Sequence, residues 1–149
     1  MELQQDFRDL FELFIAHNVE FMIVGGYALA FYGAPRYTGD MDIYVNPDGA
    51  NASRIVSALE AFGFKSTGLT VSDFDTPDKV VQLGVPPVRI DIITSLTGVT
   101  WEDAFSGRES CQYGNIPVYY IGRKELIANK RAINRKKDLA DIEAIGGED

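Results

Sequence analysis

Three aspartates stand in apolar surroundings that do not suit isolated carboxylates. Asp40 and Asp42 lie two residues apart in the segment Asp40–Val45, which otherwise holds apolar residues and a tyrosine. This alternation predicts a strand, and side chains two apart on a strand leave the same face. Asp91 is the lone carboxylate of a second apolar run, residues 88–93. Carboxylates in such positions are costly to bury unless they are paired or bind a metal.

Two carboxylates on one face repel each other unless a positive charge lies between them. A hard divalent cation such as Mg²⁺, which prefers oxygen ligands, would relieve this repulsion. If the two strands are neighbours, the three aspartates would form a two-metal site that stabilises the attacking and leaving oxygens of phosphoryl transfer. The alternatives are a solvated Asp-x-Asp pair at a strand edge, and a salt bridge from Asp91 to Arg89 or Arg36.

Two adjacent glycines form the other candidate element of a site. Gly25 and Gly26 stand between Phe21–Val24, an apolar run that predicts a buried strand, and residues 27–32, which predict a short helix. Backbone N–H groups at such a turn can approach a phosphate closely. A plain tight turn is the alternative interpretation.

The remaining sequence predicts the elements that must position these residues. Their order predicts an α/β (α+β) fold, a mixed β-sheet flanked by helices, in one domain spanning residues 1–149 with a C-terminal helical segment at about 123–145. We expect helices at 3–15, 55–62 and 123–134, strands at 80–85, 88–93, 112–113 and 118–121, a helical turn at 101–105, and a short strand and a loop within 64–79.

Composition limits the chemistry and the location. The chain has 149 residues, one cysteine and one histidine, so carboxylates are the groups available for catalysis. Without a signal-peptide pattern or a membrane-length apolar run, the sequence predicts a cytoplasmic protein. The net charge is −8, yet residues 123–137 carry +6, leaving −14 for the rest of the chain. Only this basic segment offers a surface for a partner such as tRNA.

Taken together, the motifs resemble those of the DNA polymerase β-like nucleotidyltransferase superfamily. The pattern is strand, Gly25-Gly26, short helix, then Arg36-x-Thr38-x-Asp40-x-Asp42 on the next strand and a later lone Asp91. The chain is most similar to the small stand-alone branch that includes minimal nucleotidyltransferases and abortive-infection-type toxins. Many members have a serine or threonine after the first glycine, where this chain has Gly26.

The resemblance implies two Mg²⁺ ions and transfer of a nucleoside monophosphate from a nucleoside triphosphate (NTP) to an acceptor hydroxyl. Asp40, Asp42 and Asp91 match the metal-binding and catalytic aspartates. The nucleotide-binding candidates are Gly25, Gly26, Arg36, Thr38 and Lys130. Lys130 belongs to a basic-then-acidic pattern, Lys130-x4-Arg135-x2-Asp138-x2-Asp141, and could act as a mobile point charge on the triphosphate. A salt bridge between Arg135 and Asp138 is an equally good interpretation.

The sequence leaves the acceptor open. The hypotheses are a toxin–antitoxin component that modifies tRNA or a partner protein, an antibiotic-modifying enzyme, and a catalytically silent binding module. The presence of all three aspartates disfavours the silent module. A small hydroxylated acceptor would need an acidic pocket, whereas an RNA acceptor would need the basic segment.

Overall fold

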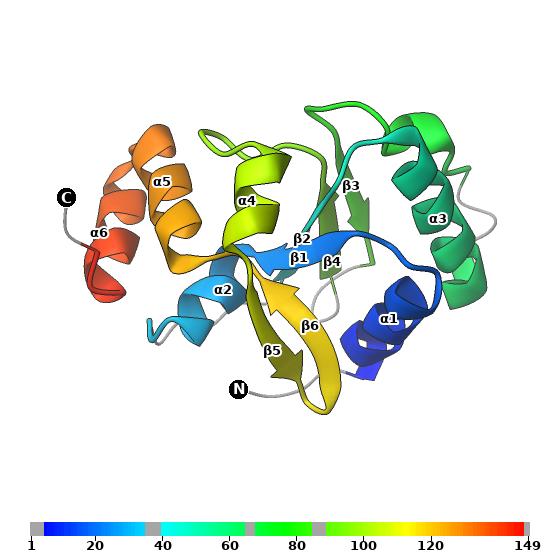
Figure 1. The fold of residues 1–149 in the computed structure, drawn as a ribbon, viewed down its shortest axis with the longest axis horizontal. Coiled ribbons are helices and arrows are strands. Elements are labelled where there is room, and N and C mark those ends of the chain that lie inside the picture. Colours follow the sequence, from blue (N-terminus) through cyan, green and yellow to red (C-terminus); the bar gives the residue numbers. More distant parts are fainter. Residues whose placement is uncertain (1–4, 35–39, 65–67, 85–88, 148–149) are drawn as a thin grey trace.

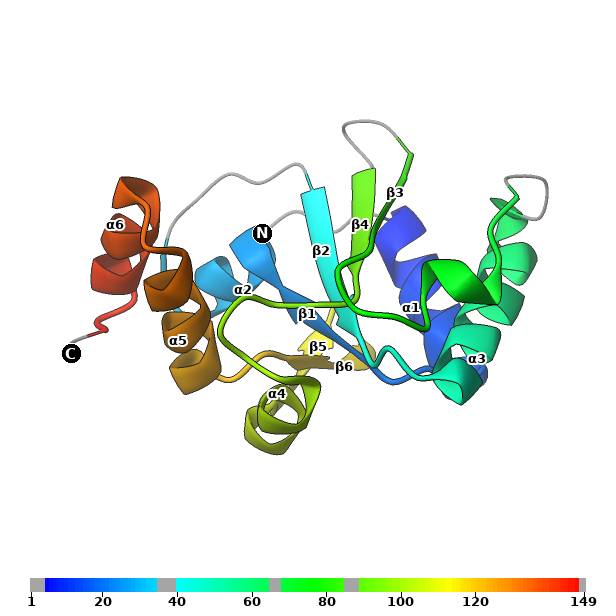
Figure 2. The ribbon, with the colours of Figure 1, turned by 90° about the horizontal axis from the view of Figure 1, so that it is seen from above.

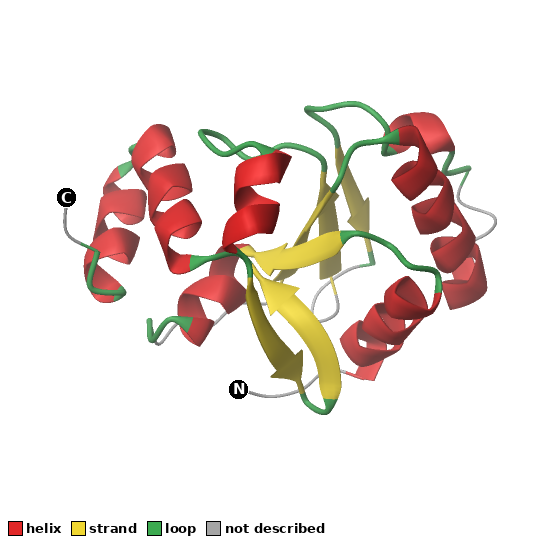
Figure 3. Ribbon diagram, in the orientation of Figure 1, coloured by secondary structure: helices red, strands yellow, loops and turns green. Residues whose placement is uncertain are grey.

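A mixed sheet of six strands forms the centre of the described structure, with helices around it (Figure 1, Figure 3). The computed structural model describes residues 5–34, 40–64, 68–84 and 89–147. The α-helices are α1 (Gln5–Ala16), α2 (Gly25–Phe31), α3 (Gly49–Leu59), α4 (Trp101–Gly107), α5 (Arg123–Ile133) and α6 (Lys136–Ala144). The strands are β1 (Phe21–Val24), β2 (Asp40–Val45), β3 (Val80–Leu83), β4 (Arg89–Ile93), β5 (Glu109–Tyr113) and β6 (Ile116–Tyr120).

The strand order is β3-β4-β2-β1-β6-β5. β1 pairs antiparallel with β2 and parallel with β6, while β2 pairs parallel with β4. The outer strands β3 and β5 pair antiparallel with their neighbours. The sheet is therefore mixed, and the expected fold class is confirmed.

The apolar stripe of α1 supplies much of the core. Phe7, Leu10, Phe11 and Phe14 have no exposed surface, as expected from their three- and four-residue spacing. Phe7 and the buried Tyr27 of α2 meet edge to face, with ring centroids 6.0 Å apart. This contact anchors α2, the helix that follows the glycine pair, against α1.

Two local predictions differ from the structure. The short helix begins at Gly25 and not at Tyr27, so both glycines belong to its first turn. The strand expected within 64–79 is not found among the described residues there. A π-helical turn at Glu60–Phe64 leads into that region, which contains a 3₁₀ turn at Val71–Asp73.

The C-terminal helices α5 and α6 lie side by side (Figure 2). α5 ends at Asn134, whose left-handed backbone (φ 60°) reverses the chain. The Arg123 guanidinium donates two hydrogen bonds to the Ile145 carbonyl oxygen, at 3.1 and 2.9 Å, which joins the start of α5 to the end of α6. Within the described residues, no helix combines the length and apolar character needed to cross a membrane.

Candidate functional site

The sheet register brings the three aspartates together. Asp42 on β2 lies directly opposite Asp91 on β4, and Asp40 lies opposite Arg89. Asp40 and Asp42 share one face of β2, whereas the intervening Met41 is fully buried on the other. Figure 2 shows the N-terminal ends of β2 and β4 side by side. The structure therefore places all three predicted carboxylates on adjacent parallel strands.

Gly25 brings the backbone of α2 against this carboxylate group. Its φ of +69° lies in the left-handed region, and a Cβ atom built on it would overlap the Oδ2 atom of Asp42. Glycine is thus required here both for backbone conformation and for close approach. Gly26 follows as the second residue of the helix. Gly25 therefore lies next to Asp42, while a phosphate-binding role of the glycine pair stays a prediction.

The electrostatics of the cluster concentrate on Asp42. Burial, together with the nearby Asp91 and Asp40 carboxylates, raises the pKa of Asp42 from 3.8 to about 6, and the charges of Arg89 and Lys130 oppose this rise. Asp42 therefore sits in an excess of negative charge, which a divalent cation would relieve.

Arg89 is in direct contact with the cluster. Its Nε donates to Asp91 Oδ1 at 3.2 Å and its Nη2 donates to Asp91 Oδ2 at 3.1 Å. Its Nη1 lies 3.8 Å from Asp40 Oδ2. The Arg89–Asp91 salt bridge, one of the two that the sequence offered, is present, whereas Arg36 lies outside the described residues.

Lys130 belongs to a separate ion-pair cluster between α5 and α6. Its Nζ lies 3.4 Å from Asp138 Oδ1 and 3.3 Å from Asp141 Oδ2. Arg135 also binds Asp138, with its Nε 2.6 Å from Oδ2. Hydrogen bonds from Arg135 hold the pKa of Asp138 well below its usual range. Lys130 is buried and fixed in place, so the expectation that it is a mobile charge is wrong, and the expected Arg135–Asp138 salt bridge is confirmed.

The all-carboxylate donor set suits Mg²⁺, which prefers oxygen ligands, and a bound cation would favour the charged form of Asp42, which burial and the two neighbouring carboxylates disfavour. Across the described residues, no group of three or more His, Cys, Asp or Glu side chains arranged to hold a metal ion is found. The two-metal site therefore stays a prediction. Arg36 and Thr38 lie outside the described residues.

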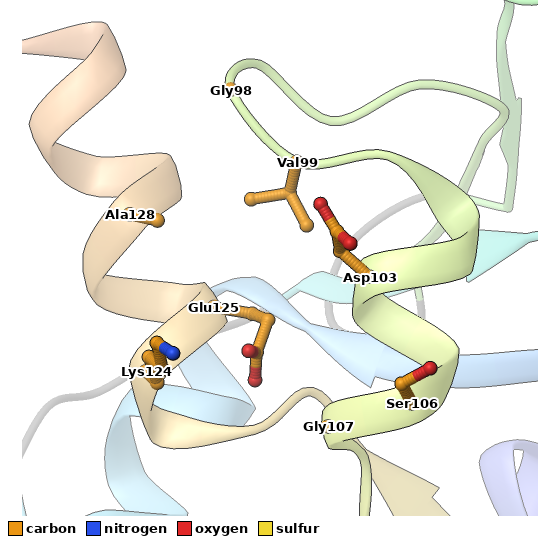
Figure 4. Close-up of a pocket in the computed structure, with 8 residues that line it drawn as sticks. All are labelled: Gly98, Val99, Asp103, Ser106, Gly107, Lys124, Glu125 and Ala128. Carbon is orange, nitrogen blue, oxygen red and sulfur yellow. The ribbon is translucent and has the colours of Figure 1, made fainter.

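A cavity of about 410 Å³ lies between α4 and α5. Figure 4 shows Asp103 and Glu125 extending into it from the two helices, with Lys124 at its edge. None of the site aspartates lines this cavity. In Figure 2, α4 lies on the side of the molecule away from the N-terminal ends of β2 and β4. The cavity is therefore separate from the aspartate cluster.

Comparisons with known proteins bear on the fold. No protein-family model matches the sequence, and a search of curated proteins finds no match. Solved structures do match. A putative nucleotidyltransferase, TM1012 from Thermotoga maritima, is similar with a TM-score of 0.58 and 15% identity, over 97% of this chain and 93% of that one. The chain has the nucleotidyltransferase fold.

Two further structures with this fold are an antibiotic adenylyltransferase and an antibiotic-resistance factor. The lincosamide antibiotic adenylyltransferase LnuA, solved with lincomycin bound, matches with a TM-score of 0.55 and 12% identity over 98% of each chain. The antibiotic-resistance factor ANT(2'')-Ia matches with a TM-score of 0.58 and 11% identity, over 94% of this chain and 80% of that one. At identities this low, the structural similarity shows the nucleotidyltransferase fold alone.

Replacing Asp42 should make this nucleotidyltransferase-fold protein more stable at neutral pH in metal-free buffer. Because the folded-state pKa of Asp42, about 6, exceeds the unfolded value of 3.8, protonation stabilises the fold below pH 4 and this contribution disappears as pH rises through 6. Asp42→Asn should therefore match wild type near pH 4 and exceed its melting temperature above pH 6.

Thermal melts from pH 4 to 8 in EDTA measure this difference. Glu143→Gln, which neutralises an exposed carboxylate on α6, is the control and should show no such pH-dependent gain. A constant difference between Asp42→Asn and wild type across the range would contradict the electrostatic explanation.

The close approach of Gly25 to Asp42 predicts a specific destabilisation. Gly25→Ala should lower the free energy of unfolding by about 1 kcal/mol, because alanine is strained in the left-handed region. Overlap of the new Cβ atom with Asp42 should lower it further. Gly68→Ala is the matched control, because Gly68 has a φ of +78° and open space around its Cβ position. Urea unfolding of both variants, alone and with Asp42→Ala, should show that removing the Asp42 carboxylate restores more stability to Gly25→Ala than to Gly68→Ala. Equal losses in the two glycine variants would count against the contact.

Proposed function

We propose that this protein is a nucleotidyltransferase that moves a nucleoside monophosphate from an NTP to a hydroxyl group of an acceptor. The observation that carries the proposal is the placement of Asp40 and Asp42 beside Asp91 on adjacent parallel strands of a nucleotidyltransferase fold. Carboxylates on neighbouring strands are the arrangement that a metal-assisted phosphoryl transfer needs.

In the proposed reaction the acceptor oxygen attacks the α-phosphorus of the NTP. A new O–P bond forms, the bond from the α-phosphorus to the leaving oxygen breaks, and its electron pair departs with pyrophosphate. The acceptor hydroxyl loses its proton to a base, for which we propose Asp91. Phosphoryl transfer needs little covalent participation from the protein, so positioning and charge stabilisation account for most of the catalysis.

Each remaining residue has a proposed binding role. Asp40, Asp42 and Asp91 would hold two Mg²⁺ ions, which when bound would neutralise charge on the triphosphate and polarise the acceptor hydroxyl. The backbone of Gly25 and Gly26 would approach the β- and γ-phosphates. Arg36, Thr38 and Lys130 are further nucleotide-binding candidates. The electrostatic effect of Lys130 on Asp42 supports its inclusion, as a charge fixed by Asp138 and Asp141.

For the acceptor we favour a small hydroxylated molecule over RNA. Three of the seven basic residues in 123–137 are held by contacts within the chain: Arg123 with the Ile145 carbonyl, Lys130 with two aspartates, and Arg135 with Asp138. Fewer cations therefore remain for phosphate contacts. The antibiotic adenylyltransferase LnuA, of similar length and fold, supports a small-molecule acceptor.

Substitution of the aspartates should separate binding from chemistry. We expect Asp40→Asn and Asp42→Asn to lose Mg²⁺-dependent ATP binding, because each removes a proposed ligand of both metal ions, whereas Asp91 would complete only the second metal site. Asp91→Asn should keep much of the binding and lose turnover by about 10²- to 10⁴-fold, the usual contribution of a general base. Calorimetric titration with ATP and Mg²⁺, and pyrophosphate release with lincomycin or total tRNA as acceptor, measure the two effects.

Glu143→Gln again serves as the exposed-carboxylate control. If Asp40→Asn and Asp42→Asn bind ATP with Mg²⁺ as tightly as wild type, the site is misassigned. If Asp91→Asn loses ATP binding and turnover equally, Asp91 holds the metal ions and is not the base.

The exposed basic residues decide between acceptor classes. Lys124, Arg131, Lys136 and Lys137 remain exposed on α5 and α6. With a small-molecule acceptor, replacing all four by glutamine should leave pyrophosphate release unchanged. An RNA-binding face would instead show tRNA affinity that falls steeply with salt, with a slope that flattens by about 0.9 for each phosphate contact removed. Filter binding of total tRNA between 50 and 200 mM salt makes the measurement. A steep slope that the fourfold variant loses would establish an RNA acceptor, as expected for a tRNA-modifying toxin.

A further inference from the structure

Arg89 occupies the oxygens that a metal ion would need. It lies two residues before Asp91 on β4, so both side chains leave the same face, and it pairs in register with Asp40. Its guanidinium donates to both oxygens of Asp91 and lies 3.8 Å from Asp40 Oδ2. One side chain therefore contacts two of the three aspartates of the cluster.

Of the cations in the part of the chain that the structure describes, Arg89 forms ion pairs with Asp40 and Asp91. The nearby Lys130 also acts on Asp42, but its ammonium lies between Asp138 and Asp141, which offset its charge. The Arg89 side chain is about one-third exposed (32%), whereas that of Asp91 is 13% exposed. The guanidinium thus has a route to solvent that the carboxylate beneath it lacks.

We propose that Arg89 is a resident counter-cation of the aspartate cluster, and that a divalent cation binds there by displacing its ion pairs. The inference rests on the proposed function insofar as the aspartates are metal ligands. A guanidinium and a metal ion both require carboxylate oxygens, and each lowers the charge available to the other. Arg89 therefore sets the metal affinity of the site and frees Asp91 when the metal binds.

Metal binding without nucleotide tests this directly. Arg89→Met removes the charge and the donors while keeping an unbranched side chain. We expect its affinity for Mn²⁺ alone, measured from the free-ion electron paramagnetic resonance signal, to rise about tenfold over wild type, the equivalent of one pKa unit of charge interaction. In EDTA the variant should melt below wild type, because its three carboxylates lose their counter-ion, and Mn²⁺ should raise its melting temperature by more.

Two further variants control for charge and for structure. Arg89→Lys keeps the charge without the two-pronged contact and should bind Mn²⁺ closer to wild type than Arg89→Met does. Lys137→Met removes an exposed cation on α6 and should leave the Mn²⁺ affinity unchanged. Folded Arg89→Met that binds Mn²⁺ equally or more weakly would overturn the proposal, because Arg89 would then orient Asp91 and not compete with the metal.

A measurement on the wild-type protein covers the case in which Arg89→Met does not fold. The Nε–H signal of Arg89 in a ¹⁵N spectrum should shift and exchange faster with water at saturating Mg²⁺, as its bond to Asp91 is lost. An unchanged signal would overturn the proposal. Failure of the proposed function can be distinguished from failure of the counter-cation role. If the wild-type protein binds Mn²⁺ through Asp42 but releases no pyrophosphate, only the proposed nucleotidyl transfer is contradicted. Wild type that binds no Mn²⁺ contradicts the counter-cation role.

Discussion

Repulsion between carboxylates on two adjacent strands is the constraint on which the site depends. The β2–β4 register sets Asp42 opposite Asp91, and buried apolar residues on both strands hold that register: Met41, Ile43, Ile90 and Ile92. A slip of one residue would expose these side chains and bury the acids, so burial of the apolar face fixes the acidic one. Hydrophobic packing thus stabilises an arrangement that electrostatics alone disfavours.

The surroundings of the cluster offset this repulsion only in part. Arg89 neutralises about one charge, and Asp42 keeps a pKa of about 6 because burial and two carboxylates outweigh the nearby cations. Gly25 allows the backbone of α2 to lie against Asp42, at a place where a Cβ atom would overlap the carboxylate. A site that remains short of positive charge when the chain is fully folded is suited to acquire it from a bound ligand.

The sequence predicts well which carboxylates lie together and predicts poorly which residues contact them. The Asp-x-Asp spacing and the lone Asp91 identify the carboxylates, since acids are rare in apolar strands. The pattern carries no information on strand direction. The pairing of Asp40 with Arg89, and the hydrogen bonds from Arg89 to Asp91, therefore depend on the tertiary fold. Lys130 illustrates the same limit. Its partners, Asp138 and Asp141, lie eight and eleven residues further along the chain on another helix. The same spacing of charges in the sequence would fit a row of exposed side chains or a buried ion-pair cluster.

The charge distribution also bears on which molecules reach the site. With a net charge of −8, the chain repels polyanions at long range and attracts cations. The basic segment does not reverse this field near the aspartates, because Lys130 and Arg135 are matched by Asp138 and Asp141. A triphosphate would therefore approach most favourably as its complex with a divalent cation, which carries less negative charge. The same field favours a neutral or cationic acceptor over RNA, so the surface electrostatics and the aspartate cluster support the same class of small-molecule chemistry.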